Sequence, residues 1–175
     1  ASTFDESVDF TTKMRRKIAY CGALRKQGRY EDALVEINEC EDMKDLLGED
    51  EKALEGKLYY SKASVYYSQG NSEEALRYYE MSLEIKLEKL GARHPDVADS
   101  YGNMAIVYDR QGNSEEALRY YEMSLEIRLE KLGARHPSVA SSYGNMAIVY
   151  DSQGNYEEAL RYFEMSLEIR LEKLG

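Results

Sequence analysis

Proline is scarce in this sequence, with two residues among 175, and the β-branched residues that favour strands are few. Glu, Leu, Ala and Arg are abundant instead, and they favour helices, so the composition predicts an all-α chain. No stretch holds the roughly 20 apolar residues of a membrane span. Residues 1–6 also lack the basic and apolar regions of a signal peptide. We therefore expect a cytoplasmic protein that does not bind a membrane.

Basic charge is also in short supply. Lys and Arg number 23 against 33 Asp and Glu, which gives a formal net charge of -10. Nucleic acids and anionic membrane surfaces both require a basic footprint on the protein that binds them. This charge balance argues against both as partners.

Cysteine occurs only as Cys21 and Cys40. Two cysteines are too few for a scaffold held by disulfides, so we expect both to be small, reduced core residues. A disulfide between them is the alternative, because two helices packed side by side can bring such thiols together.

Internal repetition is what the sequence has in abundance. Residues 92–133 and 134–175 align without a gap, at a period of 42 residues. Residues 70–91 and 112–133 also align, and their one difference is Lys86/Arg128. The longer pair differs at five positions: Asp96/Ser138, Asp99/Ser141, Arg110/Ser152, Ser114/Tyr156 and Tyr121/Phe163. Recurrence at a fixed period of this length is typical of helical repeat arrays.

An older copy of the repeat lies upstream, where Gln27–Leu34 aligns with Gln69–Leu76. We therefore interpret residues 1–175 as one domain of four repeats, which cover about residues 7–48, 51–91, 92–133 and 134–175. The first repeat is degenerate and more polar, which suits a terminal repeat with one face in water.

Each repeat is predicted to contain two helices. In the third repeat, Pro95 suits the first turn of a helix that Gly112 ends. Asn113 can cap a second helix, and Glu116 three residues later completes a capping box. Gly133 is placed to close that helix in a left-handed turn.

The second helix of the third repeat carries two apolar rows. One row contains Ala117, Leu118, Tyr121, Leu125, Leu129 and Leu132, and the other contains Tyr120, Met123 and Ile127. A helix that is wet on one side needs only one row, so two rows predict a stack of helix pairs. Small residues such as Ala105 would let the helix axes approach closely.

The segment Tyr101–Leu118 resembles the tetratricopeptide repeat. The aromatic Tyr101 and Tyr108, the small Ala105 and the turn residue Gly112 occur in the order and spacing of that motif. The 42-residue period is similar to that of kinesin light chain repeats. The resemblance implies a right-handed α-solenoid of four helix-turn-helix repeats. It also implies a scaffold for protein–protein interaction and not an enzyme.

In proteins of that family, the first helices line a concave groove that binds peptides. Asn103 and Asn145 match asparagines that hold peptide backbone in kinesin light chains, and an amide both donates and accepts hydrogen bonds. Alternatively, these two residues are solvated and were kept by duplication. The resemblance implies a groove of Asn103, Asn145, Gly102, Gly144, Ile106, Ile148, Asp109, Asp151, Arg110, Tyr60 and Tyr67.

Motifs for catalysis, metal binding or a cofactor are absent from the sequence. His94 and His136 precede prolines one repeat apart, with no Cys or carboxylate at ligand spacing, so we interpret them as residues at the start of a helix. No arrangement for a nucleophile and no phosphate-binding glycine loop occurs. We expect no catalytic residues, no metal and no cofactor.

Self-association is the alternative function. The sequence stops after the last second helix, without a polar capping helix, so we expect an exposed apolar face that includes some of Tyr162, Met165 and Ile169. Such a face would allow head-to-tail stacking of copies. The same ending fits a fragment of a longer natural array or an engineered array. The sequence does not identify the partner.

Overall fold

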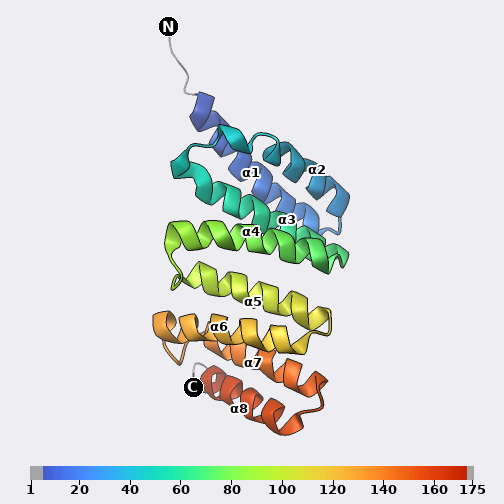
Figure 1. The fold of residues 1–175 in the computed structure, drawn as a ribbon, viewed down its shortest axis with the longest axis vertical. Helices are drawn as coiled ribbons and strands as arrows, with labels where there is room; N and C mark the ends of the chain where they lie inside the picture. The colour runs from blue at the N-terminus through green and yellow to red at the C-terminus, as the bar shows by residue number, and fades with distance from the viewer. Residues whose placement is uncertain (1–5, 173–175) are drawn as a thin grey trace. The chain divides into compact units, whose positions relative to one another are not determined.

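The computed structural model describes residues 6–172, and over this range the chain forms eight α-helices (Figure 1). The helices pair in chain order as α1 (Glu6–Lys26) with α2 (Tyr30–Glu41), α3 (Lys52–Gln69) with α4 (Ser72–Leu90), α5 (Pro95–Arg110) with α6 (Ser114–Leu132), and α7 (Pro137–Ser152) with α8 (Tyr156–Glu172). Two short 3-10 helices, Lys44–Leu46 and Glu49–Glu51, join α2 to α3. The predicted all-α fold of helix-turn-helix repeats is confirmed.

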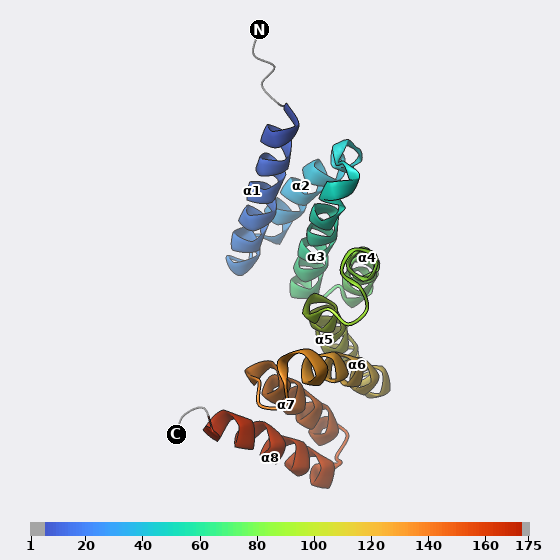
Figure 2. The same ribbon diagram turned by 90° about the vertical axis from the view of Figure 1, so that its left-hand side faces the viewer.

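The chain divides into two compact units, Ala1–Lys89 and Leu90–Gly175. The division falls at the end of α4, so each unit contains two repeats. Within each unit, helices that are consecutive in the chain lie side by side in both views (Figures 1 and 2). The interpretation of residues 1–175 as a single domain stays a prediction.

The ends of the helices in the third repeat follow the local signals of the sequence. Pro95 begins α5, and Gly112 follows it with a positive φ of 75°. The Asn113 side chain caps α6 by accepting a hydrogen bond from the backbone N–H of Glu116 at 3.3 Å. Gly133 has φ 82° and ψ 158°, so the chain leaves α6 in an extended direction and not in the predicted left-handed turn.

The core of the first unit brings together the sides of α1, α2 and α3 that face one another. Met14 and Leu24 of α1, Ile37 of α2 and Leu58 of α3 are at most 1% exposed. Cys21 and Cys40 lie in the same cluster as free, buried thiols, and burial raises the pKa of Cys21 to about 11. The prediction of reduced core cysteines is confirmed.

In the second unit, each pair of helices is joined by the same contacts. Ser124 of α6 donates a hydrogen bond to the backbone oxygen of Ala98 in α5 at 2.7 Å, and Ser166 of α8 does so to Ala140 of α7 at 2.7 Å. Tyrosine rings also stack between the helices of each pair, with centroids 5.2 and 5.3 Å apart: Tyr108 with Tyr120, and Tyr150 with Tyr162. The near-identity of the repeats therefore gives near-identical packing.

The two apolar rows of α6 contact neighbours on two sides, as predicted. Tyr120 stacks on α5, whereas Tyr121 and Leu125 pack on residues of α7 that include Met146. Ala105 of α5 is fully buried in the same cluster. The contact between the third and fourth repeats is thus formed by one row of α6, by Ala105 of α5 and by α7.

None of the described helices combines the length and the hydropathy that crossing a membrane requires.

Candidate functional site

The predicted groove residues on α5 include a glycine that is part of the packing between helices. Gly102 is buried, and a Cβ atom at this position would lie 3.5 Å from Arg128 Nη2 and 3.6 Å from Ser124 Oγ. Both distances are ordinary van der Waals contacts, so the Arg128 and Ser124 side chains lie directly over Gly102. Gly102 is therefore covered by these side chains and is not open to a ligand.

Arg128 links three helices. Its Nη2 donates to Asp99 Oδ1 of α5 at 2.8 Å, and its Nη1 donates to Ser142 Oγ of α7 at 2.8 Å and to the backbone oxygen of Ser138 at 3.3 Å. The side chain is 14% exposed. Charge-assisted hydrogen bonds of this kind are the stronger ones in proteins, so Arg128 fixes α7 on the third repeat.

In the second repeat, different side chains occupy the positions of Gly102 and Arg128. Tyr60 stands 42 residues before Gly102, and Lys86 stands 42 residues before Arg128. The Lys86 ammonium lies over the Tyr60 ring at 4.9 Å, and the Tyr60 and Tyr79 rings meet edge to face at 5.6 Å. Tyr60 is 37% exposed and Tyr67 is half-buried, so both retain accessible surface on α3.

Asn103 and Asn145 are both half-buried residues of first helices. The Asn103 Nδ2 donates to the backbone oxygen of Asp99 at 2.8 Å, one turn earlier in its own helix. Asn145 lies with Gly144 and Ile148 along an open groove of the second unit. The structure therefore brings three of the predicted residues together at one place.

The charged residues predicted for the groove lie at the C-terminal ends of α5 and α7. Asp109 is half-buried, and burial raises the pKa of its carboxyl. Arg110 and Asp151 are exposed, whereas Ile106 of α5 is half-buried against the contact with α7. These residues do not line the open groove.

The open groove has a volume of about 440 Å³ and runs between α7 and α8. Gly144, Asn145 and Ile148 form its α7 side. Four residues that the sequence reasoning missed form the α8 side: Phe163, Ser166, Leu167 and Arg170. We name this surface the terminal groove.

The terminal groove is flanked by an exposed apolar stripe on α8. Its members are 43–70% exposed: Tyr156, Leu160, Phe163, Leu167 and Leu171. The sequence predicted an exposed apolar face on this helix that includes some of Tyr162, Met165 and Ile169. The exposed face is present, but the choice of these residues was wrong. Ile169 is 5% exposed and packs on Val139 and Ala140, while Tyr162 and Met165 are half-buried. The row of α8 that contains Tyr162 and Ile169 packs on α7, whereas the row that contains Phe163, Leu167 and Leu171 is exposed.

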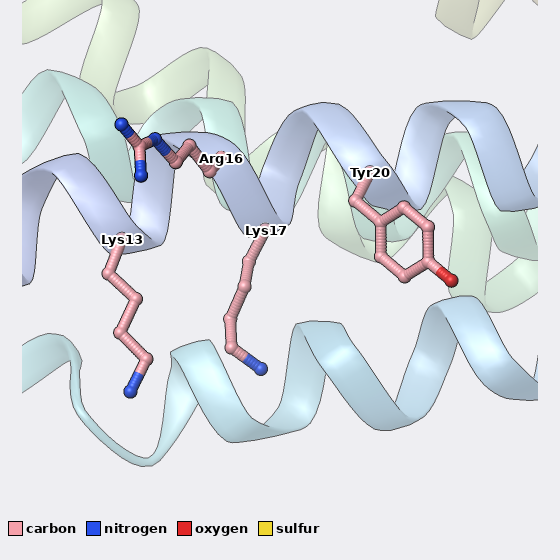
Figure 3. Close-up of a pocket in the computed structure, with 4 residues that line it drawn as sticks. All are labelled: Lys13, Arg16, Lys17 and Tyr20. Atoms are coloured by element: carbon pink, nitrogen blue, oxygen red, sulfur yellow. The ribbon is translucent and has the colours of Figure 1, made fainter.

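A second pocket, of about 280 Å³, lies on α1 in the first unit. It is lined by Lys13, Arg16, Lys17 and Tyr20 (Figure 3). Lys17 extends toward α2 and pairs there with Glu36 and Glu39, which together raise its pKa. This surface is basic although the chain as a whole is acidic.

The two histidines lie at the starts of helices. His94 Nδ1 accepts a hydrogen bond from the backbone N–H of Asp96 at 3.1 Å, and His136 Nδ1 accepts one from that of Ser138 at 3.1 Å. This confirms their interpretation as residues that open a helix. Among the described residues, no group of three or more His, Cys, Asp or Glu is arranged to hold a metal ion.

Comparison with models of protein families gives a match to the tetratricopeptide repeat. The match covers residues 17–88, 54–130 and 115–172, which overlap and together span most of the chain. A search of curated protein sequences gives no match.

Solved structures of similar fold include two proteins with a TM-score of 0.79. The crystal structure of BtubC (BKLC) from P. vanneervenii is 22% identical and covers 95% of this chain and 72% of its own. The putative kinesin light chain with nearly identical TPR-like repeats from Podosopora anserina is 21% identical, over 94% of this chain and 78% of its own. The apo form of RapI is 20% identical with a TM-score of 0.77, over 92% of this chain and 43% of its own. At these identities the similarity concerns the fold.

Proposed function

The chain belongs to the tetratricopeptide repeat family, and from that premise we propose that it is a scaffold that binds a peptide or protein segment along the first helices of its repeats. Such repeats generally mediate interactions between proteins. The proposal assigns the chain no catalytic step, and its ligand is a polypeptide and not a nucleic acid or a membrane.

The observation that carries this proposal is the terminal groove. Gly144, Asn145 and Ile148 of a first helix line it, and they are accessible to a ligand. Ile148 is 53% exposed and offers apolar contact, while the Asn145 amide offers a donor and an acceptor to peptide backbone. An apolar groove with a few polar groups is the usual design of a peptide site.

The proposal is tested with peptides selected from a displayed library by binding to the chain. Replacing Asn103→Ala together with Asn145→Ala removes both amides, and affinity for the selected peptides is expected to fall about tenfold or more. Calorimetry measures the affinity, and circular dichroism verifies that helicity is unchanged. Peptides that bind the double variant as tightly as the original chain would remove the two asparagines from the site.

Self-association through α8 is a second candidate function, which its exposed apolar stripe favours. Patches of this kind promote association. In a head-to-tail contact, α1 of one copy would lie against α8 of another. The basic side chains of Lys13, Arg16 and Lys17 would then lose water against an apolar face, which costs free energy and opposes this association. Light scattering over a concentration series tests this candidate, and a molar mass that stays that of the monomer excludes it.

A further inference from the structure

The contact between the first and second repeats contains a buried ion pair. Lys62 of α3 is 5% exposed, and its ammonium donates hydrogen bonds to the carboxylate of Glu41 and, at 3.0 Å, to Asn38 Oδ1. Both acceptors belong to α2, the second helix of the preceding repeat. The ion pair therefore joins two successive repeats and not the two helices of one repeat.

The later repeats place apolar residues at the same positions. Lys62 corresponds to a methionine in the third and fourth repeats, and Glu41 corresponds to a leucine in the second, third and fourth repeats. In the fourth repeat the methionine is Met146, which is 1% exposed and lies in one apolar cluster with Tyr121 and Leu125. A charged pair thus stands in the first repeat contact where methionine and leucine stand in the contact between the third and fourth repeats.

The lysine of this pair is charged although it is buried. Its ammonium lies 4.6 Å from the centre of the Tyr78 ring, over the ring face. Burial disfavours the charged form, but the hydrogen bond with Glu41 outweighs burial and raises the pKa of Lys62. A buried ion pair adds little stability over an apolar pair of similar size, because both ions lose their water. Stability alone therefore does not explain a lysine at this place.

The similarity of the repeats creates a need for specificity in their packing. Helices α4 and α6 differ at one position, Lys86/Arg128, so their apolar rows do not distinguish one first helix from another. At the positions of the ion pair, a carboxylate occurs in α2 alone and a lysine occurs in α3 alone. If α4 or α6 of a second copy packed on α3, the Lys62 ammonium would be buried against leucine. A buried charge without a partner is strongly unfavourable.

We propose that Lys62 and Glu41 determine the order in which the repeats stack, by making α2 the one helix of this chain that packs stably in this place on α3. Near-identical partners are distinguished when the wrong pairing leaves a charge unpaired. A single buried polar pair selects register and partner in coiled coils in the same manner. This role in assembly is independent of the proposed peptide binding.

A double-mutant cycle in the full chain tests whether the two residues act as a pair. Lys62→Met leaves the Glu41 carboxylate without its cation, and Glu41→Leu leaves the Lys62 ammonium without its anion. Each single variant is expected to lower the urea midpoint of unfolding by at least about 0.5 M. The double variant has the methionine and leucine of the later repeats, so its midpoint should return to within about 0.3 M of that of the original chain.

Refolding tests specificity separately from stability. The original chain and the double variant are refolded from urea at high protein concentration, and size exclusion with light scattering measures the species formed. The original chain should return to the species that it formed before unfolding. The double variant should form wrongly paired oligomers in an amount at least about threefold higher. Hydrogen exchange of these oligomers should show reduced protection of residues 30–41, because α2 has been displaced from α3.

Lys17→Met is the matched control. Lys17 pairs with Glu36 and Glu39 of α2, so its ion pairs lie within the first repeat. The variant removes a lysine from the same unit but leaves the contact between the first and second repeats unchanged. Its refolding should give the same species as that of the original chain.

Three results would overturn the proposal. A double variant that refolds to the same species as the original chain would show that the ion pair does not select the partner of α3. A double variant that is no more stable than the single variants would show that Lys62 and Glu41 are not coupled. Oligomers that Lys17→Met forms in equal amount would show that loss of any lysine in this unit has the same effect.

Discussion

Arg128 and Arg170 occupy the same place in successive repeats but lie in different surroundings. Arg128 hydrogen-bonds Asp99, Ser138 and Ser142, and its Nε is the one buried side-chain polar atom of the described residues that has no hydrogen-bond partner. Arg170 lies exposed along the terminal groove. A single residue type therefore holds two repeats together in one place and is available to a ligand in the other.

We expect Arg128→Ala to lower the free energy of unfolding by about 1.5–3 kcal/mol, because it removes the charge-assisted hydrogen bonds that join α6 to α5 and α7. Arg170→Ala is the matched control, and it should change stability by less than about 0.5 kcal/mol. Urea denaturation measures both. Equal losses for the two variants would show that the contacts of Arg128 with α7 contribute little.

Tyr79 predicts a dependence of stability on alkaline pH. The side chain is 4% exposed, and burial raises its pKa from 10.0 to about 12. The folded state therefore favours the neutral phenol, and this stability is complete below pH 10 and is lost as the pH rises through about 12. The loss amounts to at most about 1.4 kcal/mol per pH unit in that window.

Phenylalanine cannot ionise, so the Tyr79→Phe variant keeps its stability as the pH rises. The difference in unfolding free energy between this variant and the original chain should therefore shift in favour of the variant from pH 9 to pH 11. Comparing the two chains by urea denaturation cancels the effect of the other tyrosines. A difference that stays constant with pH would mean that burial does not hold the phenol neutral.

At the scale of the helices, the sequence predicted the elements well and their contacts less well. Proline, asparagine and glycine act through neighbouring backbone, so Pro95, Gly112 and Asn113 marked the ends of α5 and α6 correctly. The direction of an apolar row depends on the packing of helices that are distant in sequence. Ile169 was therefore expected at the surface, although it is buried, while Leu167 was missed.

The contact between repeats gives a prediction for α5. Ala105 is fully buried beside Tyr121 and Met146, so Ala105→Leu should overpack this contact and cost about 1–3 kcal/mol of unfolding free energy. Ser141→Leu, at an exposed position of α7, is the control and should change stability by less than about 0.5 kcal/mol. Denaturation midpoints of the two variants that do not differ would contradict this packing.

At the scale of the whole molecule, the family resemblance located part of the candidate site. Asn145, Gly144 and Ile148 were predicted from the first-helix motif and lie together in the terminal groove. The α8 half of the groove could not be predicted, because Phe163 and Leu167 have the same periodicity as their counterparts Tyr121, which is buried, and Leu125, which is half-buried. The same sequence pattern does not show which of the two repeats is covered by another helix. Only the exposure of these side chains in the folded chain distinguishes the two repeats.

The central claim is that this repeat protein binds a polypeptide at the first-helix surface of the fourth repeat. The most direct measurement is the NMR mapping of a library-selected peptide onto the backbone amide signals of the chain. The account predicts that the largest shifts fall on residues 144–148 of α7 and 163–170 of α8. Shifts confined to other helices, or a library that yields no binding peptide, would contradict it.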